Sequence, residues 1–171
     1  MTRFPHAMRP RRASARTLLA SAALVALASW APGALAVNCT VTANALSFGA
    51  YNTLSNLTGT TTVTITCSAW AGSNSISYTL TASAGSGTYA NRQLLTGSNV
   101  IAYNLYTTSA DTSIWGDGNG NGDGTVTLTG TVTKQQGTVT LTIYGKINGG
   151  QNVVPGSYAT MVPITVTLTY Q

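Results

Sequence analysis

The sequence predicts an all-β fold, an antiparallel sandwich or barrel, from three observations. Apolar and polar residues alternate in several runs rich in valine, isoleucine and threonine, as in strands with one face on a core. Glycine, asparagine and proline interrupt these runs at short intervals. Beyond residue 36 no segment repeats its apolar residues with the helical period of about 3.6. We expect about seven to nine strands in one domain over residues 37–171.

Residues 1–36 are predicted to be a secretory signal peptide that is not part of the fold. Five arginines precede an apolar run at 18–27, which is too short to cross a bilayer. Small residues at Ala34 and Ala36 suit cleavage after Ala36. We therefore expect a secreted protein with no membrane span once the leader is removed.

Removal of the leader also removes most of the positive charge. The remaining chain has Arg92, Lys134 and Lys146 against three aspartates, so its net charge is near zero. A nucleic-acid surface needs a basic stripe, which these residues do not supply. No nucleic-acid partner is expected.

The expected strands come in order along the chain. Alternation is clearest in five runs, at 60–67, 76–83, 125–132, 138–147 and 161–170. In the first run Val63, Ile65 and Cys67 share one face, and threonines occupy the other. Each run therefore has one face suited to a core and one suited to water.

Cys39 and Cys67 are the two cysteines of the chain. A secreted protein meets an oxidising compartment, so a single disulfide between them is the expected state. Closing this loop would stabilise the fold by roughly 3–4 kcal/mol in the chain-entropy model. The alternative is a pair of free thiols.

The side chains of residues 37–171 offer few groups for catalysis. The one histidine, His6, lies in the leader, and the acidic residues of the chain are three aspartates. Serine–histidine and cysteine–histidine catalysis are excluded, as are the common zinc sites. We expect no enzyme activity and no cofactor.

The loop at 115–124 has the spacing of oxygen ligands in a calcium loop. Its candidate ligands are Asp117, Asn119, Asn121 and Asp123. An EF-hand also needs a glutamate at its twelfth position, where Leu128 stands, and helices on both sides. A flexible connection between strands is therefore favoured over a calcium site.

A carbohydrate- or surface-binding patch is a further alternative. Trp70, Tyr89 and Trp115 stand beside loop residues, where exposed aromatic rings could contact a ligand. Such residues more often anchor loops to a core.

Three blocks of the sequence resemble the spore coat protein U domain family. They are CTVTANALSFGAYN followed by TGTTTVTITC, IAYNLYTTSADTSIWGDG at 101–118, and PGSYATMVPITVTLTY at 155–170. The blocks span residues 39–170 in the family's order and include both cysteines. The family contains secreted coat proteins and subunits of archaic chaperone–usher pili such as the Csu type.

The resemblance implies an incomplete immunoglobulin-like sandwich that lacks its final strand. The missing strand leaves a groove, which a periplasmic chaperone fills first and a neighbouring subunit fills later at the usher, by β-strand addition. On this pattern Val162, Ile164, Val166 and Leu168 would line the groove. Pro163 departs from the family pattern and predicts an unpaired or bulged stretch. The implied route runs through the periplasm to the cell surface, in a pilus or coat; the alternative is a complete sandwich.

The segment before Cys39 bears on whether this subunit also donates a strand. Val37 and Asn38 together reach only about 7 Å, whereas a working strand spans about 17–20 Å. Cleavage after Ala28 would leave ten residues, interrupted by Pro32 and Gly33. We therefore expect a minor or tip subunit, for adhesion or biofilm formation, that accepts a strand and gives none. The alternative is a stand-alone coat or matrix protein.

Overall fold

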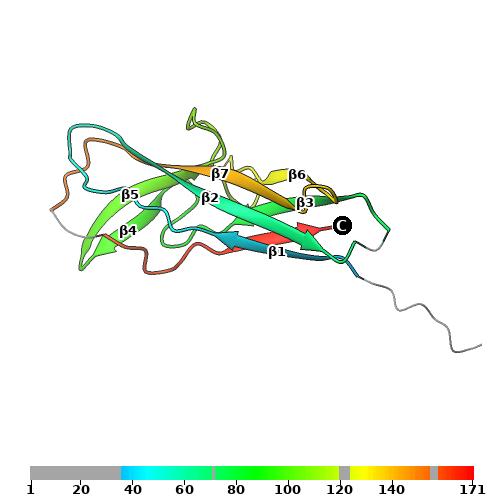
Figure 1. Cartoon of the computed structure of the whole chain (residues 1–171). Coiled ribbons are helices and arrows are strands. Elements are labelled where there is room, and N and C mark those ends of the chain that lie inside the picture. Colours follow the sequence, from blue (N-terminus) through cyan, green and yellow to red (C-terminus); the bar gives the residue numbers. More distant parts are fainter. Residues whose placement is uncertain (1–35, 71, 120–123, 155–157) are drawn as a thin grey trace, which may run out of the picture. The chain divides into compact units, whose positions relative to one another are not determined.

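The computed structural model describes residues 36–70, 72–119, 124–154 and 158–171, and these residues form two antiparallel sheets (Figure 1). The larger sheet has the order β1-β2-β7-β5-β4, and the smaller sheet has the order β6-β3-β8. The strands are β1 (Asn38–Ala43), β2 (Leu57–Ser68), β3 (Ser75–Ala82), β4 (Arg92–Thr96), β5 (Asn99–Tyr106), β6 (Leu128–Thr133), β7 (Thr138–Ile147) and β8 (Val166–Tyr170). The predicted all-β sandwich is confirmed.

The alternation of the sequence accounts for the two faces of the larger sheet. Val63 and Ile65 of β2 are buried in the core, and the threonines that alternate with them, Thr62, Thr64 and Thr66, point outward. Thr64 lies opposite Thr140 of β7, and their hydroxyl oxygens are 3.3 Å apart. The inner face therefore buries apolar surface, and the outer face is covered with hydroxyl groups.

The expected disulfide joins the first two strands. Cys39 of β1 and Cys67 of β2 lie directly opposite each other in the register, and their sulfurs are bonded at 2.06 Å. Both residues belong to the buried core, so the bond fastens the edge strand β1 to its neighbour β2.

The last expected strand is shorter in the structure than in the sequence pattern. Apolar alternation runs through 161–170, but β8 begins only at Val166. Pro163 has no N–H to donate, which explains why the ladder does not extend through it. The side chains of Ser83 and Ser86 bond this stretch instead: Ser86 Oγ accepts from the N–H groups of Met161 and Val162, and Ser83 Oγ accepts from that of Thr165.

Within the described part of the chain, no helix is long and apolar enough to cross a membrane. The predicted signal peptide lies outside the described residues except for Ala36. The described residues begin at Ala36, so the predicted cleavage site before Val37 lies at their boundary.

Candidate functional site: an open groove between the sheet edges

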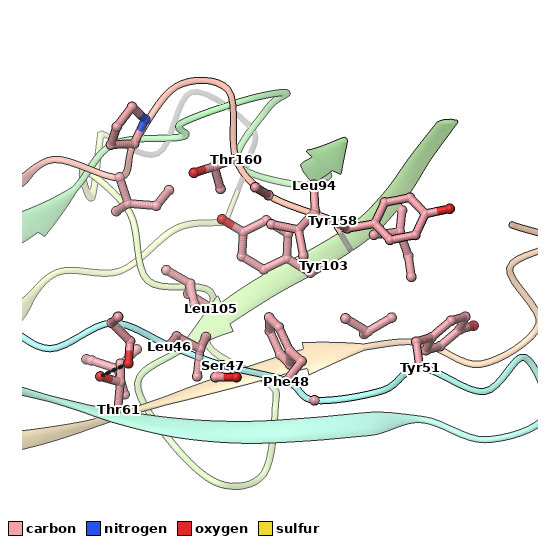
Figure 2. A pocket seen from close by; sticks show the side chains of 18 of the residues that line it. Leu46, Ser47, Phe48, Tyr51, Thr61, Leu94, Tyr103, Leu105, Tyr158 and Thr160 are labelled. Atoms are coloured by element: carbon pink, nitrogen blue, oxygen red, sulfur yellow. Dashed lines mark hydrogen bonds between the residues drawn. The ribbon is translucent and has the colours of Figure 1, made fainter. Parts of the chain in front are cut away.

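A cavity of about 960 Å³ opens into the core of the sandwich. Two segments form its walls: residues 43–49, from the last residue of β1 onward, and residues 158–166, up to the first residue of β8. Figure 2 shows Leu46, Ser47 and Phe48 on one side, Tyr158 and Thr160 on the other, and Tyr103 between them. We call this cavity the groove; its floor is made of core side chains, among them Val63, Leu94, Ile101, Tyr103, Leu105 and Ile143.

The first wall crosses the inner face of the larger sheet at a pair of glycines. Gly59 of β2 and Gly145 of β7 lie directly opposite each other. A Cβ added at Gly145 would lie 2.8 Å from Cζ of Phe48 and closer still to Cδ2 of Leu46. The absence of side chains at these two positions therefore lets Leu46 and Phe48 pack against the sheet and form the wall.

The second wall is hydrogen-bonded to strand β4 and to the loop that precedes the wall. Leu95 and Ala159 exchange two backbone hydrogen bonds, of 2.7 and 3.1 Å. The hydroxyl of Tyr158 donates to the carbonyl of Val154 at 2.6 Å. These bonds anchor residues 158–159 to β4 and to the carbonyl of Val154.

One edge of β8 borders the groove and has no strand partner among the described residues. The other edge pairs with β3, and Ser77 and Gln171 exchange two backbone bonds of 3.1 Å. In an antiparallel pair such bonds recur at every second residue. Thr167 and Thr169 therefore bond to β3, and the backbone N–H and C=O groups of Val166 and Leu168 point to the free edge.

At its Tyr170 end, the free edge of β8 is covered by strand β1. β1 and β8 lie next to each other (Figure 1), and the hydroxyl of Tyr170 donates to the carbonyl of Val37 at 3.5 Å. The two strands do not pair, and the groove lies beyond Val166, at the other end of β8.

The side chain of Tyr103, on β5, extends into the groove. It is only 6% exposed, and Phe48 packs edge-on against its ring with centroids 5.7 Å apart. Burial raises the pKa of the Tyr103 hydroxyl, and the charge of Arg92 lowers it in part. At neutral pH this hydroxyl is therefore protonated and can donate a hydrogen bond.

Arg92, opposite Tyr103 in the β4–β5 register, is fully buried without a carboxylate partner among the described residues. Its guanidinium donates to the side-chain oxygen of Asn104 and to the carbonyls of Ser83 and Trp115, and it lies 5.4 Å from the ring centre of Tyr89. Burial lowers its pKa. These bonds tie three separate segments together beside the groove.

The structure places the four predicted groove residues in three different environments. Ile164 and Val166 line the groove, and Leu168 packs against the core. Val162 is 56% exposed and is not part of the lining, because the chain bends before Pro163. The sequence pattern did not single out Leu46, Phe48 or Tyr103.

The predicted calcium residues are only partly described. Asn121 and Asp123 lie outside the described residues, and the described part of the chain has no cluster of three metal-ligating side chains. Both carboxylate oxygens of Asp117 accept hydrogen bonds, from the backbone and side-chain N–H groups of Asn119 and the hydroxyl of Thr125. The Asn119 backbone bond is the main reason that the pKa of Asp117 is lowered. These bonds form a turn within the loop.

The aromatic residues proposed for a surface patch are not arranged as one. Trp115 is 2% exposed, and its indole N–H donates to the carbonyl of Leu80 in the core. Trp70 packs against the core, and the ring of Tyr89 lies beside the guanidinium of Arg92. Trp115 therefore cannot serve as a surface contact in this structure.

Two comparisons with known proteins bear on the groove. The sequence model of the Spore Coat Protein U domain matches residues 25–165, which is most of the chain. No protein of curated function matches the sequence.

Proposed function

This chain belongs to the Spore Coat Protein U domain family, and we propose that it is a non-enzymatic structural subunit of a surface pilus whose groove accepts a β-strand from another protein. One observation carries the proposal: the free edge of β8 borders a cavity of about 960 Å³ that reaches the core and is lined by both apolar and polar side chains. A disulfide and a family whose role is structural are consistent with a secreted protein of this kind.

An open groove of this kind favours strand addition on physical grounds. Unpaired N–H and C=O groups at a sheet edge are a template for another strand. Alternate side chains of that strand would enter the groove and cover apolar core atoms, at about 25 cal/mol for each Å² removed from water. Backbone pairing with Val166 and Leu168 would give affinity, and the shape of the groove would give specificity.

The partners that we propose follow from this mode of binding. A periplasmic chaperone would donate the first strand and protect the groove in transit, and a neighbouring subunit would replace it at the usher. We further propose that residues 1–36 are removed, so that Val37 and Asn38 are too short to serve as a donor strand. The subunit would then take a minor or tip position. N-terminal sequencing of the secreted protein should decide between cleavage after Ala36 and cleavage after Ala28.

A closed coat or matrix protein is the second candidate, and one contact favours it. The bond from Tyr170 to Val37 already joins the edges of β1 and β8 at one end. If the walls of the groove closed in the same way, the sandwich would be complete without a partner.

The test is a strand peptide added to the secreted, disulfide-bonded protein. Its length should be about 12 residues, to lie along residues 159–170, with valine facing the groove and threonine facing outward. We expect a one-to-one complex by native mass spectrometry and a higher unfolding temperature. A control peptide with aspartate at the inward positions should not bind, because the groove would bury its charges. A stable monomer that ignores both peptides would contradict strand acceptance and support the closed coat protein.

A further inference from the structure

We propose that Tyr103 biases the choice of the strand that fills the groove by favouring a hydroxyl- or amide-bearing side chain at one inward position. This inference rests on the proposed function and goes beyond it, because it states which strand sequences fit. It begins from a polar group in an otherwise apolar floor.

The hydroxyl of Tyr103 has no hydrogen-bond partner among the described residues. The Tyr103 oxygen is nevertheless accessible to water. Among the described residues, Arg92 Nε is the side-chain polar atom that is both fully buried and without a hydrogen-bond partner, and the Tyr103 oxygen is not such an atom. The Tyr103 oxygen therefore faces the open groove, in agreement with its place between the two walls in Figure 2. In the empty groove, water can satisfy it.

A strand that fills the groove removes this water. An apolar strand would leave the Tyr103 hydroxyl buried without a partner, which is unfavourable, whereas a strand with a suitable oxygen or nitrogen would restore the bond. A site that hydrogen-bonds a polar group of its ligand discriminates strongly against ligands that lack that group. An apolar pocket discriminates less strongly against a ligand that lacks one methyl group.

The partner must come from a side chain of the incoming strand. Tyr103 belongs to the larger sheet, and the new strand would join the smaller sheet beside β8. Backbone groups of the new strand would point along the sheet toward Val166 and Leu168, whereas its alternate side chains would point across the gap of about 10 Å between sheets. The aromatic ring carries the Tyr103 hydroxyl into that gap.

The position of the hydroxyl is fixed by its neighbours. Phe48 of the first wall packs edge-on against the Tyr103 ring, at an interplanar angle of 71°. The side-chain oxygen of Asn104, the next residue, accepts from the Leu105 N–H and from the Arg92 guanidinium, and its amide nitrogen donates to the carbonyl of Tyr89. These bonds hold this part of β5 in place. A fixed donor can discriminate between strands because it cannot turn away from an unsuitable one.

The test scans the alternating peptide, replacing each inward valine in turn by threonine, which has nearly the same shape. We expect one position at which threonine binds about three- to tenfold more tightly than valine, as one recovered hydrogen bond predicts. In Tyr103→Phe this preference should disappear or reverse, while the all-valine peptide still binds. In the control Tyr144→Phe, which removes a tyrosine hydroxyl from the outer face of β7 and does not touch the lining of the groove, the preference should persist.

The outcomes separate the two proposals. If no peptide of the series binds, the proposed strand acceptance fails, and the selection by Tyr103 fails with it. If peptides bind but no threonine position depends on the Tyr103 hydroxyl, strand acceptance stands and the inference is overturned.

Discussion

An alanine at Gly145 should destabilise the protein through the first wall of the groove. Its Cβ would lie 2.8 Å from Phe48 Cζ and nearer to Leu46 Cδ2, whereas carbon atoms pack at about 3.5–4.0 Å. The wall must therefore move by about 1 Å. Overpacking of this kind costs about 1–3 kcal/mol, and the stiffer unfolded chain offsets about 0.5–1 kcal/mol. We expect the free energy of unfolding to fall by about 1–2 kcal/mol.

The second half of this prediction is a double-mutant cycle with Leu46→Ala. Shortening Leu46 makes room for the new Cβ, so the two substitutions should cost at least about 1 kcal/mol less together than the sum of their separate effects. The assay is urea unfolding followed by the fluorescence of the buried Trp115. The matched control is Gly130→Ala with Leu46→Ala, because a Cβ at Gly130 would meet Tyr78 in the other sheet.

The cycle can refute the structural reasoning. The control pair should be additive within about 0.5 kcal/mol, since the two sites share no partner. If Gly145→Ala and Leu46→Ala were equally additive, Leu46 would not pack over Gly145, and residues 43–49 would not form the wall described.

Three further predictions concern stability. Replacing Cys39 and Cys67 by alanine should lower the free energy of unfolding by about 3–4 kcal/mol in urea titrations; an unchanged midpoint would contradict this. Burial raises the pKa of Tyr78 and Tyr103 above 10.0, so their contribution to stability is present below that pH and should be lost as pH rises beyond it. Tyr103→Phe should reduce the loss of stability at alkaline pH, and an equally steep loss in this variant would contradict the role of Tyr103. The pKa of Asp117 is lowered from 3.8, chiefly by a backbone N–H, so the contribution of its carboxylate to stability is present above that pH and should be lost in acid. Asp117→Asn should remove this part of the acid dependence of the free energy of unfolding. An unaltered dependence would contradict the role of Asp117.

The sequence predicted the regular part of the fold well. Alternation around Val63 and Ile65 gave the inner and outer faces of β2, and the compartment inferred from the leader gave the disulfide. These features depend on local pattern and on general chemistry, which a single sequence contains. The same alternation placed Ile164 and Val166 on one face of the last run, whereas a groove beside them was implied by the family resemblance.

The walls of the groove could not be predicted in the same way. Leu46 and Phe48 form a wall because Gly59 and Gly145 stand opposite each other, and that pairing depends on a strand register between distant segments. Alternation also suggested an inward Val162, but Pro163 ends the ladder and the chain bends away.

The burial of Arg92 is a second feature that sequence reasoning missed. A charged side chain is normally expected at the surface. Here its partners are backbone carbonyls and an asparagine from separate segments, which become neighbours only in the folded chain.

Amide hydrogen exchange at β8 tests strand acceptance most directly. In the free protein the N–H groups of Thr167 and Thr169, which bond to β3, should exchange slowly, and those of Val166 and Leu168 at the free edge should exchange fast. In the complex with the alternating peptide all four should exchange slowly. If Val166 and Leu168 were already protected in the isolated protein, or stayed unprotected in the complex, the groove would not be a site for an added strand.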